Sequence, residues 1–331
     1  MQMRKLGTTG PTVSAFGLGA MGMSGPYGPA DRAESLATIH AALDAGINLI
    51  DTGDFYGMGH NEMLIGEALK GRRDEAVLSV KFGAQRSPDG AFLGFDASPN
   101  AVKTACAYSL ERLGVDHIDV YRPARLDPNT PIEATIGAIA ELIEAGYVRH
   151  IGLSEVGAET IRRAAAVYPI VDLQIEYSML SRGIEDEILS VCRELGIAIT
   201  AYGVLARGLI GGHLKAAPTD PTDWRSHGPR FQGENLDRNL ALGETLRKVA
   251  EARGLTPAQA AIAWVAAQGP DIFPLVGARR RDRLAEALGA LDATLTPADL
   301  AELETAIPKG AAAGERYPAV QMAMLDSERK A

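Results

Sequence analysis

The chain has few cysteines and no long apolar segment. Its two cysteines, Cys106 and Cys192, are too few for a disulfide-rich scaffold, and both lie in helix-like stretches. We therefore expect free thiols in a reducing compartment. No run of about 18 apolar residues is present, and no apolar stretch follows a basic start at the N-terminus. These absences predict a soluble, cytoplasmic protein without a membrane segment.

Positive charge is also scarce. The chain has 33 lysines and arginines against 42 acidic residues, which gives a net charge of −9. This balance argues against a nucleic-acid surface, because phosphate contacts require clustered cations. The six histidines provide no pair at metal-ligand spacing, so we expect no metal site. The expected partner is a small molecule, and an oligomer is possible.

Short apolar runs alternate with helical stretches along the whole chain. Runs rich in valine and isoleucine are typical of strands that are buried on both faces of a parallel sheet. They occupy residues 15–20, 47–51, 76–81, 117–121, 148–154, 171–177, 197–203 and 272–277. Eight such strands with crossover helices predict an (α/β)8 TIM barrel, and we expect a single domain over residues 1–331.

The alternative is an open, doubly wound sheet. That architecture requires a glycine-rich turn between its first strand and its first helix. Gly17, Gly19 and Gly22 superficially fit such a turn. The residues after them indicate a loop and not a helix, so we discount this alternative.

Capping residues mark the expected helices. Asp31 is expected to begin a helix that ends before Gly46, because a carboxylate accepts from free helical N–H groups and glycine terminates helices. Ser98 is expected to begin another helix. Thr130 is expected as the N-cap of a third, with Glu133 three residues later as in a capping box.

Three segments depart from the alternating pattern. Residues 1–17 indicate a small β-hairpin that turns at Thr9-Gly10, and we expect it to close the bottom of the barrel. Residues 82–97 and 204–235 are long loops that follow strand ends. Because barrel active sites are built from loops at the C-terminal strand ends, we expect both loops to wall a substrate pocket.

Asp51, Tyr56 and Lys81 are the residues that most clearly suggest chemistry. Asp51 and Lys81 end two consecutive predicted strands, and Tyr56 follows Asp51 on a loop. Adjacent strand ends face one cavity, so the three side chains are expected to converge. A lysine ammonium lowers the pKa of a nearby tyrosine, which would let Tyr56 exchange a proton near neutral pH. The alternative is a purely structural Asp–Lys ion pair beside an ordinary loop tyrosine.

Six segments, in order and with matching spacings, resemble the aldo-keto reductase family. They are IDTGDFYGMGHNEMLIGEAL, LSVKFG, GLSE, LQIEYS, AYGVLARGLIGG and PLVGARRRDRLAEAL. The resemblance covers almost the whole chain. It implies NADPH-dependent reduction of an aldehyde or ketone to an alcohol, with the hydride supplied by the nicotinamide. It further implies that Tyr56 is the general acid, that Lys81 tunes it and that Asp51 supports Lys81.

The resemblance also implies a set of NADPH-binding residues. Ser154 and Gln174 match positions that hold the nicotinamide carboxamide, with Glu155 where many members have asparagine, and Tyr202 matches the aromatic residue that stacks on the ring. The full set is Gly19, Met21, Asp51, Ser154, Gln174, Tyr202, Gly203, Leu205, Arg207, Gly208, Gly277, Arg279, Arg280, Arg283 and Glu286.

Two groups within this set match phosphate-binding segments. Leu205, Arg207 and Gly208 match the loop that binds the pyrophosphate. The segment 277–286 matches the one that grips the 2′-phosphate, and it contains the only dense arginine cluster in an acidic chain. Arginine suits phosphate because its guanidinium is planar, always charged and able to form paired hydrogen bonds. The cluster therefore favours NADPH over NADH.

One departure from the family pattern concerns the end of the fourth strand. The family usually has a histidine there that orients the substrate carbonyl, whereas this chain has Ala124. Arg122 shares a strand face with position 124 by period-two alternation, and we hypothesise that it contributes instead. The alternative is that Arg122 pairs with a barrel acid such as Asp119 or Asp51.

Two other functions stay open. Lys81 could form a Schiff base in an aldolase-like lyase, although that role leaves the arginine cluster unexplained. The missing histidine also allows an NADPH-binding regulatory or weakly catalytic member of the family. Tyr317, near the C-terminus, is expected either to wall the substrate pocket or to pack on the barrel exterior.

Overall fold

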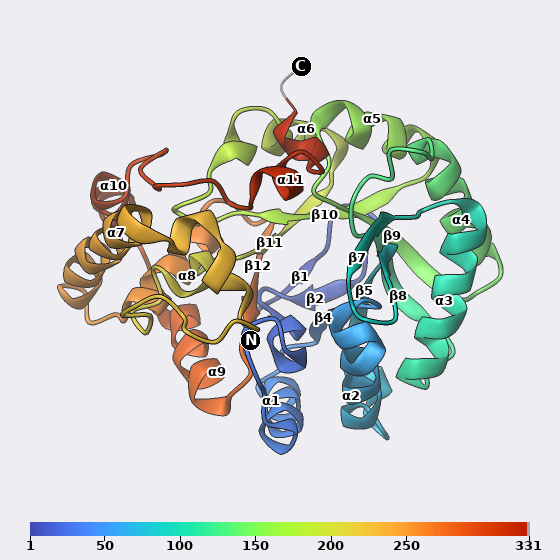
Figure 1. Cartoon of the computed structure of the whole chain (residues 1–331), viewed down its shortest axis with the longest axis horizontal. Coiled ribbons are helices and arrows are strands. Elements are labelled where there is room, and N and C mark those ends of the chain that lie inside the picture. The colour runs from blue at the N-terminus through green and yellow to red at the C-terminus, as the bar shows by residue number, and fades with distance from the viewer. Residues whose placement is uncertain (330–331) are drawn as a thin grey trace.

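The computed structural model describes residues 1–329, so the last two residues of the domain predicted over 1–331 lie outside the described part. Its centre is a closed barrel of eight parallel strands, in the order β10-β11-β12-β3-β4-β5-β8-β9 (Figure 1). The predicted barrel is confirmed. Its strands are β3 (Gly17–Gly19), β4 (Leu49–Gly53), β5 (Val77–Phe82), β8 (Ile118–Pro123), β9 (Val148–Ser154), β10 (Ile170–Glu176), β11 (Ala198–Tyr202) and β12 (Ile272–Gly277).

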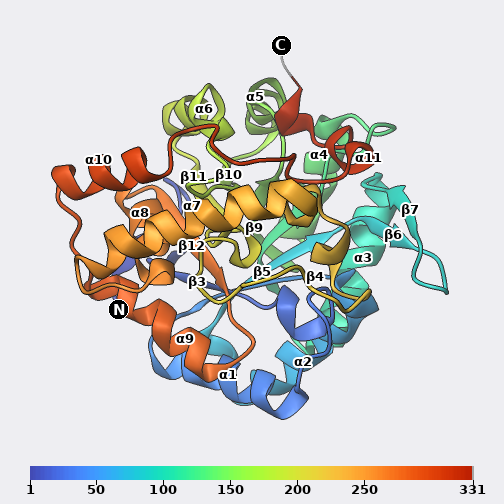
Figure 2. The same cartoon turned by 60° about the vertical axis from the view of Figure 1, so that its left-hand side comes forward.

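Helices surround the barrel and cover the outer faces of its strands (Figures 1 and 2). Eight of them alternate with the strands: α1 (Arg32–Asp44), α2 (His60–Ala68), α3 (Pro99–Leu113), α4 (Ile132–Glu144), α5 (Ala158–Val167), α6 (Ile188–Leu195), α8 (Pro257–Ala267) and α9 (Arg281–Leu288). Three more are α7 (Gly233–Glu251), α10 (Pro297–Ala306) and α11 (Ala319–Met322). No helix among residues 1–329 combines the length and the apolarity that a membrane crossing requires.

The helix starts confirm one capping prediction and correct another. The carboxylate of Asp31 accepts from the Glu34 N–H at the start of α1, as expected. Thr130 is not the N-cap of α4, because Pro131 holds that position and the Thr130 hydroxyl instead donates to Asp127. Ser98 stands at the N-cap of α3, but its side chain makes no capping hydrogen bond.

A β-hairpin closes the N-terminal end of the barrel, as predicted. It consists of β1 (Met3–Lys5) and β2 (Thr12–Ser14), which pair antiparallel. Leu6, at the end of β1, is fully buried. It belongs to a compact apolar cluster with Val13 of β2 and with residues from five barrel strands, namely Leu49, Val120, Val171, Ala198 and Phe273. This end of the barrel is therefore filled, which leaves the other end for chemistry.

The two loops expected to wall a pocket follow β5 and β11. The first contains a small antiparallel pair, β6 (Ala84–Arg86) and β7 (Phe92–Phe95), which extends away from the barrel (Figure 2). The second, over 204–235, contains three short 3-10 turns and the start of α7.

We expect Leu6→Ala to lower the free energy of unfolding by about 2–5 kcal/mol, because it opens a cavity in a closed apolar cluster. Chemical denaturation followed by circular dichroism measures this change. Leu93→Ala is the matched control, because Leu93 is 67% exposed, and we expect a change below about 0.5 kcal/mol. Equal effects of the two substitutions would contradict the sealing role of the hairpin.

Candidate active site

Asp51 is the acceptor around which the C-terminal end of the barrel is organised. It lies on β4 and is only 3% exposed. One carboxylate oxygen accepts from the Lys81 ammonium at 2.5 Å, and the other accepts from Ser79 at 2.9 Å and from Gln174 at 2.7 Å. Donors from β5 and β10 thus converge on one buried carboxylate, as the predicted meeting of Asp51 and Lys81 requires.

Tyr56 joins this cluster from the loop after β4. The Lys81 ammonium lies 5.1 Å from the centre of the Tyr56 ring. Burial, followed by the charge of Asp51, raises the pKa of Tyr56 well above its usual value, and the charge of Arg125 lowers it by less. The expectation of a lowered pKa was wrong, because the loss of water around the phenol outweighs the nearby cations. Tyr56 is a protonated phenol at neutral pH.

Burial also shifts the pKa of Lys81. Removal of the ammonium from water lowers the pKa to about 8, although Asp51 opposes this shift. Arg122 and Arg125 lower the pKa further by charge repulsion. Lys81 is therefore a lysine whose charge changes within a pH range that activity measurements can reach.

Arg122 does not pair with either of the acids expected for it. Its guanidinium lies 3.0 Å from Asp172 on β10, and neither side chain is exposed. Asp119 instead binds Arg73. Arg122 also donates to Ser79 at 3.0 Å, and Ser79 donates to Asp51. The structure thus places Arg122 beneath the site as a buried ion pair that contacts Asp51 through one hydroxyl.

Gly152 on β9 makes room for this ion pair. A Cβ atom at Gly152 would lie 2.5 Å from an oxygen of Asp172 and 2.9 Å from Nε of Arg122. Both distances are shorter than contacts that a side chain tolerates. Packing therefore explains the glycine of the GLSE segment in this chain. Any larger residue at position 152 would push Arg122 and Asp172 apart.

Arg125 is a residue beside the site, next to Ser154, that the sequence analysis missed. It follows Ala124, which is buried, and its Nη1 donates back to the Ala124 carbonyl at 2.6 Å. The same nitrogen lies 3.5 Å from the hydroxyl of Ser154. Period-two alternation favoured Arg122, but β8 ends at Pro123, and the alternation no longer applies at residue 125. The only signal in the sequence was an arginine just after a strand end.

Glu155 connects the ends of β9 and β10 to the C-terminal segment. Its backbone is left-handed, with φ of 52°, a conformation that asparagine adopts more readily than glutamate. The carboxylate accepts from Tyr202 at 2.7 Å, from Ser327 at 2.7 Å and from Arg316 at 2.9 Å. Arg316 also binds Glu176. Sequence reasoning did not identify this buried network, because Arg316 is distant from Glu155 along the chain.

Tyr202 and Tyr317 meet at this network. Their hydroxyl groups lie 2.9 Å apart, so Tyr317 faces the barrel mouth and does not pack on the exterior. The Arg207 guanidinium packs against the rings of Tyr317 and Trp224, 4.6 and 4.7 Å from their centres, and pairs with Glu176 at 2.8 Å. The Arg207 side chain is therefore fully engaged inside the protein, and only its backbone is available to a pyrophosphate.

The remaining glycine and loop positions lie together at the same end of the barrel. Gly277 pairs in register with Gly19, and Gly19 pairs with Asp51. Met21 begins a short 3-10 turn after β3. Gly203 and Gly208 have φ values of 68° and 104°, which glycine adopts without strain. Leu205 lies between these two glycines, at the N-cap of a 3-10 turn.

The arginine cluster forms the turn between β12 and α9. Arg280 pairs with Asp282, Arg281 with Glu34, and Arg283 with Glu286. Arg279 differs from these, because it donates to the backbone carbonyls of residues 27–29. A hollow of about 520 Å³ is lined by Glu34, Arg280, Arg281 and Asp282.

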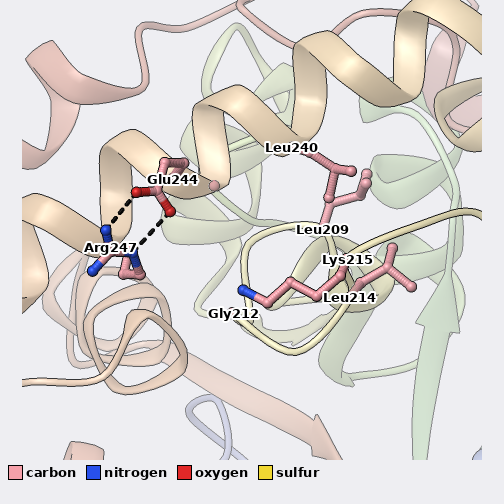
Figure 3. A pocket seen from close by; sticks show the side chains of 8 residues that line it. Leu209, Gly212, Leu214, Lys215, Leu240, Glu244 and Arg247 are labelled. Atoms are coloured by element: carbon pink, nitrogen blue, oxygen red, sulfur yellow. Dashed lines mark hydrogen bonds and ion pairs between the residues drawn. The ribbon is translucent and has the colours of Figure 1, made fainter.

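A second hollow, shown in Figure 3, is lined by none of the predicted site residues, although Leu209 in its lining directly follows Gly208. It has a volume of about 200 Å³ and is lined by Leu209, Gly212, Leu214, Lys215, Leu240, Gly243, Glu244 and Arg247. Glu244 and Arg247 face each other across an ion pair on α7. No group of metal-ligating side chains occurs within residues 1–329.

Comparisons with known proteins agree on one family. The model of the Aldo/keto reductase family matches residues 15–308. Probable aldo-keto reductase 1 of Glycine max is 43% identical over 323 residues, which cover 96% of this chain and 92% of that protein. Aldo-keto reductase yakc of Schizosaccharomyces pombe, whose name includes NADP(+), is 41% identical over 95% of this chain and 94% of that protein. The glycerol dehydrogenase AKR11B4 from Gluconobacter oxydans has a similar structure, with a TM-score of 0.83, 30% identity and coverage of 92% of this chain and 94% of that chain.

We expect Arg122→Leu to lower the free energy of unfolding by about 3–5 kcal/mol, because it leaves Asp172 buried without its counter-charge. Adding Asp172→Leu should restore at least half of the loss, since the lone charge is then removed as well. Denaturant titration of the two variants measures both effects.

The same double variant tests whether Arg122 acts on the substrate. If Arg122 only supports the fold, the double variant should retain turnover within about 10-fold of the parent. The only contact to the site that it loses is the hydrogen bond from Arg122 to Ser79. A folded double variant that loses more than about 100-fold would show that Arg122 contributes directly.

Proposed function

This chain belongs to the aldo-keto reductase family, and we propose that it reduces an aldehyde or ketone to an alcohol with NADPH, with Tyr56 as proton donor. The observation that carries the proposal is the convergence of Tyr56, Lys81 and Asp51 at the open end of the barrel. The name of the fission-yeast relative supports NADP(H) as the cofactor.

The proton transfer follows from the state of Tyr56. Its raised pKa keeps the phenol protonated at neutral pH, so it is a donor before reaction. When bound, NADPH would supply the hydride that the carbonyl carbon accepts, and the Tyr56 hydroxyl would give its proton to the carbonyl oxygen. The ammonium of Lys81 then stabilises the resulting phenolate, which takes up a proton from water. Asp51 holds Lys81 in place through a hydrogen bond of 2.5 Å.

The arginine turn fits the 2′-phosphate of NADPH. Arg280 is paired only with an exposed carboxylate, and its side chain is 59% exposed. Exposed ion pairs contribute only about 0–1 kcal/mol, so a phosphate with two charges can replace Asp282 as the partner of Arg280. The N-cap residue of α9 makes no side-chain capping hydrogen bond. The Glu34 carboxylate instead accepts from the Arg281 N–H at 2.9 Å, which agrees with the preference of a helix start for anions.

The roles of the arginines in this turn therefore differ. We assign Arg280 and Arg283 to the phosphate, whereas Arg279 orders the loop over residues 27–29. Glu286 positions Arg283 by an ion pair of 3.2 Å. At the other end of the cofactor, Ser154 and Gln174 lie opposite each other in the register of β9 and β10 and are proposed to hold the carboxamide, with Tyr202 beside the ring.

A Schiff-base lyase is the second candidate, and the pKa of Lys81 near 8 is the observation that favours it. The ammonium is held by Asp51, however, and must lose both its proton and this contact before it can attack a carbonyl. Borohydride trapping of a carbonyl substrate on Lys81 would support the lyase. Steady oxidation of NADPH by aldehydes would exclude both the lyase and a purely regulatory protein.

We expect Tyr56→Phe to lower kcat by about 10²–10⁴-fold, because it removes the proton donor without altering the ring. The Kd for NADPH should change by less than about 2-fold. Loss of NADPH absorbance with an aldehyde panel measures the first quantity, and quenching of protein fluorescence measures the second. Tyr108→Phe is the control, because Tyr108 is 61% exposed on α3. Unchanged turnover in Tyr56→Phe would exclude the proposed role.

We expect kcat/KM for reduction to fall as the pH rises through about 8. The folded pKa of Lys81 is lowered to about 8, so the charged form that stabilises the phenolate predominates below this pH and is lost above it. Lys81→Arg keeps the charge at all relevant pH values, and its descending limb should move to higher pH even if its absolute rate is lower. If the fall in kcat/KM occurs at the same pH in Lys81→Arg as in the parent, a group other than Lys81 causes it.

A further inference from the structure

Arg125 is the cation at the mouth of the barrel that has no acidic partner within residues 1–329. Each other buried cation near the site lies against a carboxylate, namely Lys81, Arg122, Arg207 and Arg316. The side-chain contacts of Arg125 among residues 1–329 are the Ala124 carbonyl and the Ser154 hydroxyl, both made by Nη1. Neither contact compensates a full positive charge.

Glu155, the carboxylate whose charge acts on Arg125, already accepts hydrogen bonds from other residues. Burial tends to lower the pKa of Arg125, but Tyr202, Tyr317 and Glu155 raise it by more, so the guanidinium stays charged. The oxygens of Glu155 accept from Arg316, Ser327 and Tyr202. Glu155 is therefore not free to turn toward Arg125.

The free edge of the guanidinium has the geometry that a carboxylate requires. Nη1 is occupied by the backbone, whereas Nε and Nη2 make no hydrogen bond to residues 1–329. These two nitrogens lie on one edge of the planar group, and their parallel N–H bonds match the two oxygens of a carboxylate. A single carbonyl oxygen would use only one of them.

Arg125 also lies close to the proposed reaction centre. The Ala124 N–H donates to the Phe82 carbonyl at 2.8 Å, and Phe82 follows Lys81 at the end of β5. Arg125 therefore stands at the strand ends beside Lys81, and its charge lowers the pKa values of both Tyr56 and Lys81. Arg125 is partly exposed, whereas Ala124 beside it is buried, so a substrate group can reach the guanidinium itself. A carbonyl at Tyr56 and an anionic group at Arg125 can thus belong to one small molecule.

We propose that Arg125 binds a carboxylate of the substrate, so that the preferred substrates are carbonyl compounds that also carry a carboxylic acid. This inference rests on the proposed reductase function and specifies its substrate class. Arg125 is thereby a specificity-determining residue, and substrate orientation comes from the carboxylate and not from a histidine at position 124.

Turnover of matched acids and esters tests this proposal. Glyoxylate, succinic semialdehyde and para-formylbenzoate are each compared with the corresponding methyl ester in the presence of NADPH. For the acid whose length fits, we expect kcat/KM at least about 10-fold above that of its ester, as a charge-assisted pair allows. If every ester is reduced as well as its acid, the substrate class is wrong while the reductase function stands. If no compound is reduced, the reductase function itself fails.

Substitution of Arg125 then assigns the preference to one residue. Arg125→Met should lower kcat/KM for the preferred acid by about 100-fold, mainly through KM, and for its ester by less than about 3-fold. Arg125→Lys keeps the charge but not the two-pronged edge, and its loss should be about 10-fold. Arg162→Met is the control for loss of an arginine, because Arg162 is 47% exposed and pairs with Glu194 on the helix surface. Equal losses for acid and ester in Arg125→Met would overturn the proposal.

A binding measurement separates recognition from catalysis. Calorimetric titration of the protein with para-toluate and with para-toluamide needs no turnover. We expect the carboxylate to bind at least about 10-fold more tightly than the amide, and this difference to disappear in Arg125→Met. A difference that persists in that variant would place the anion site elsewhere. Arg125→Lys provides a second folded variant in which an intermediate affinity is expected.

Discussion

The buried carboxylate of Asp51 is the constraint on which the active end of this barrel depends. A single charge at 3% exposure would be strongly unfavourable without partners. Lys81, Ser79 and Gln174 each donate to it, so the cost of burial is offset by three hydrogen bonds from two other strands. These same bonds fix the ammonium of Lys81 near Tyr56. The same hydrogen bonds therefore stabilise the buried charge and set the geometry of the proposed proton transfer.

Charge and apolar packing occupy opposite ends of the barrel. The N-terminal end is filled by the hairpin residue Leu6 and its apolar neighbours. Above this layer the Arg122–Asp172 pair crosses the interior, and Gly152 leaves the space that the pair requires. The Asp51 cluster follows, and Arg125 lies at the mouth with a free edge. From the hairpin toward the mouth, apolar side chains give way to charged ones. Among these charges inside the barrel, only that of Arg125 has nitrogen atoms free to bind a ligand.

The sequence predicted the parts of the structure that depend on local pattern. The runs over 148–154 and 272–277 coincide with β9 and β12, because buried parallel strands are continuously apolar and end at polar or glycine residues. The partner of Arg122 was not predictable in this way. Asp172 lies two strands away, and the tilt of a closed barrel decides which side chains meet across its interior. The direction of the Tyr56 pKa shift was missed for a related reason, since burial is a property of the folded chain and not of residue spacing.

The C-terminal segment shows how the mouth of the barrel depends on residues far from the strands. Glu155 is held in a left-handed conformation that a non-glycine residue adopts only when its surroundings compensate the strain. Arg316 and Ser327 supply that compensation by binding its carboxylate. Tyr317, the neighbour of Arg316, then contacts Tyr202 at the predicted nicotinamide position. The segment that follows α10 therefore contacts the residue proposed to lie beside the nicotinamide. The strained glutamate thus anchors this segment to the end of β9 through its carboxylate.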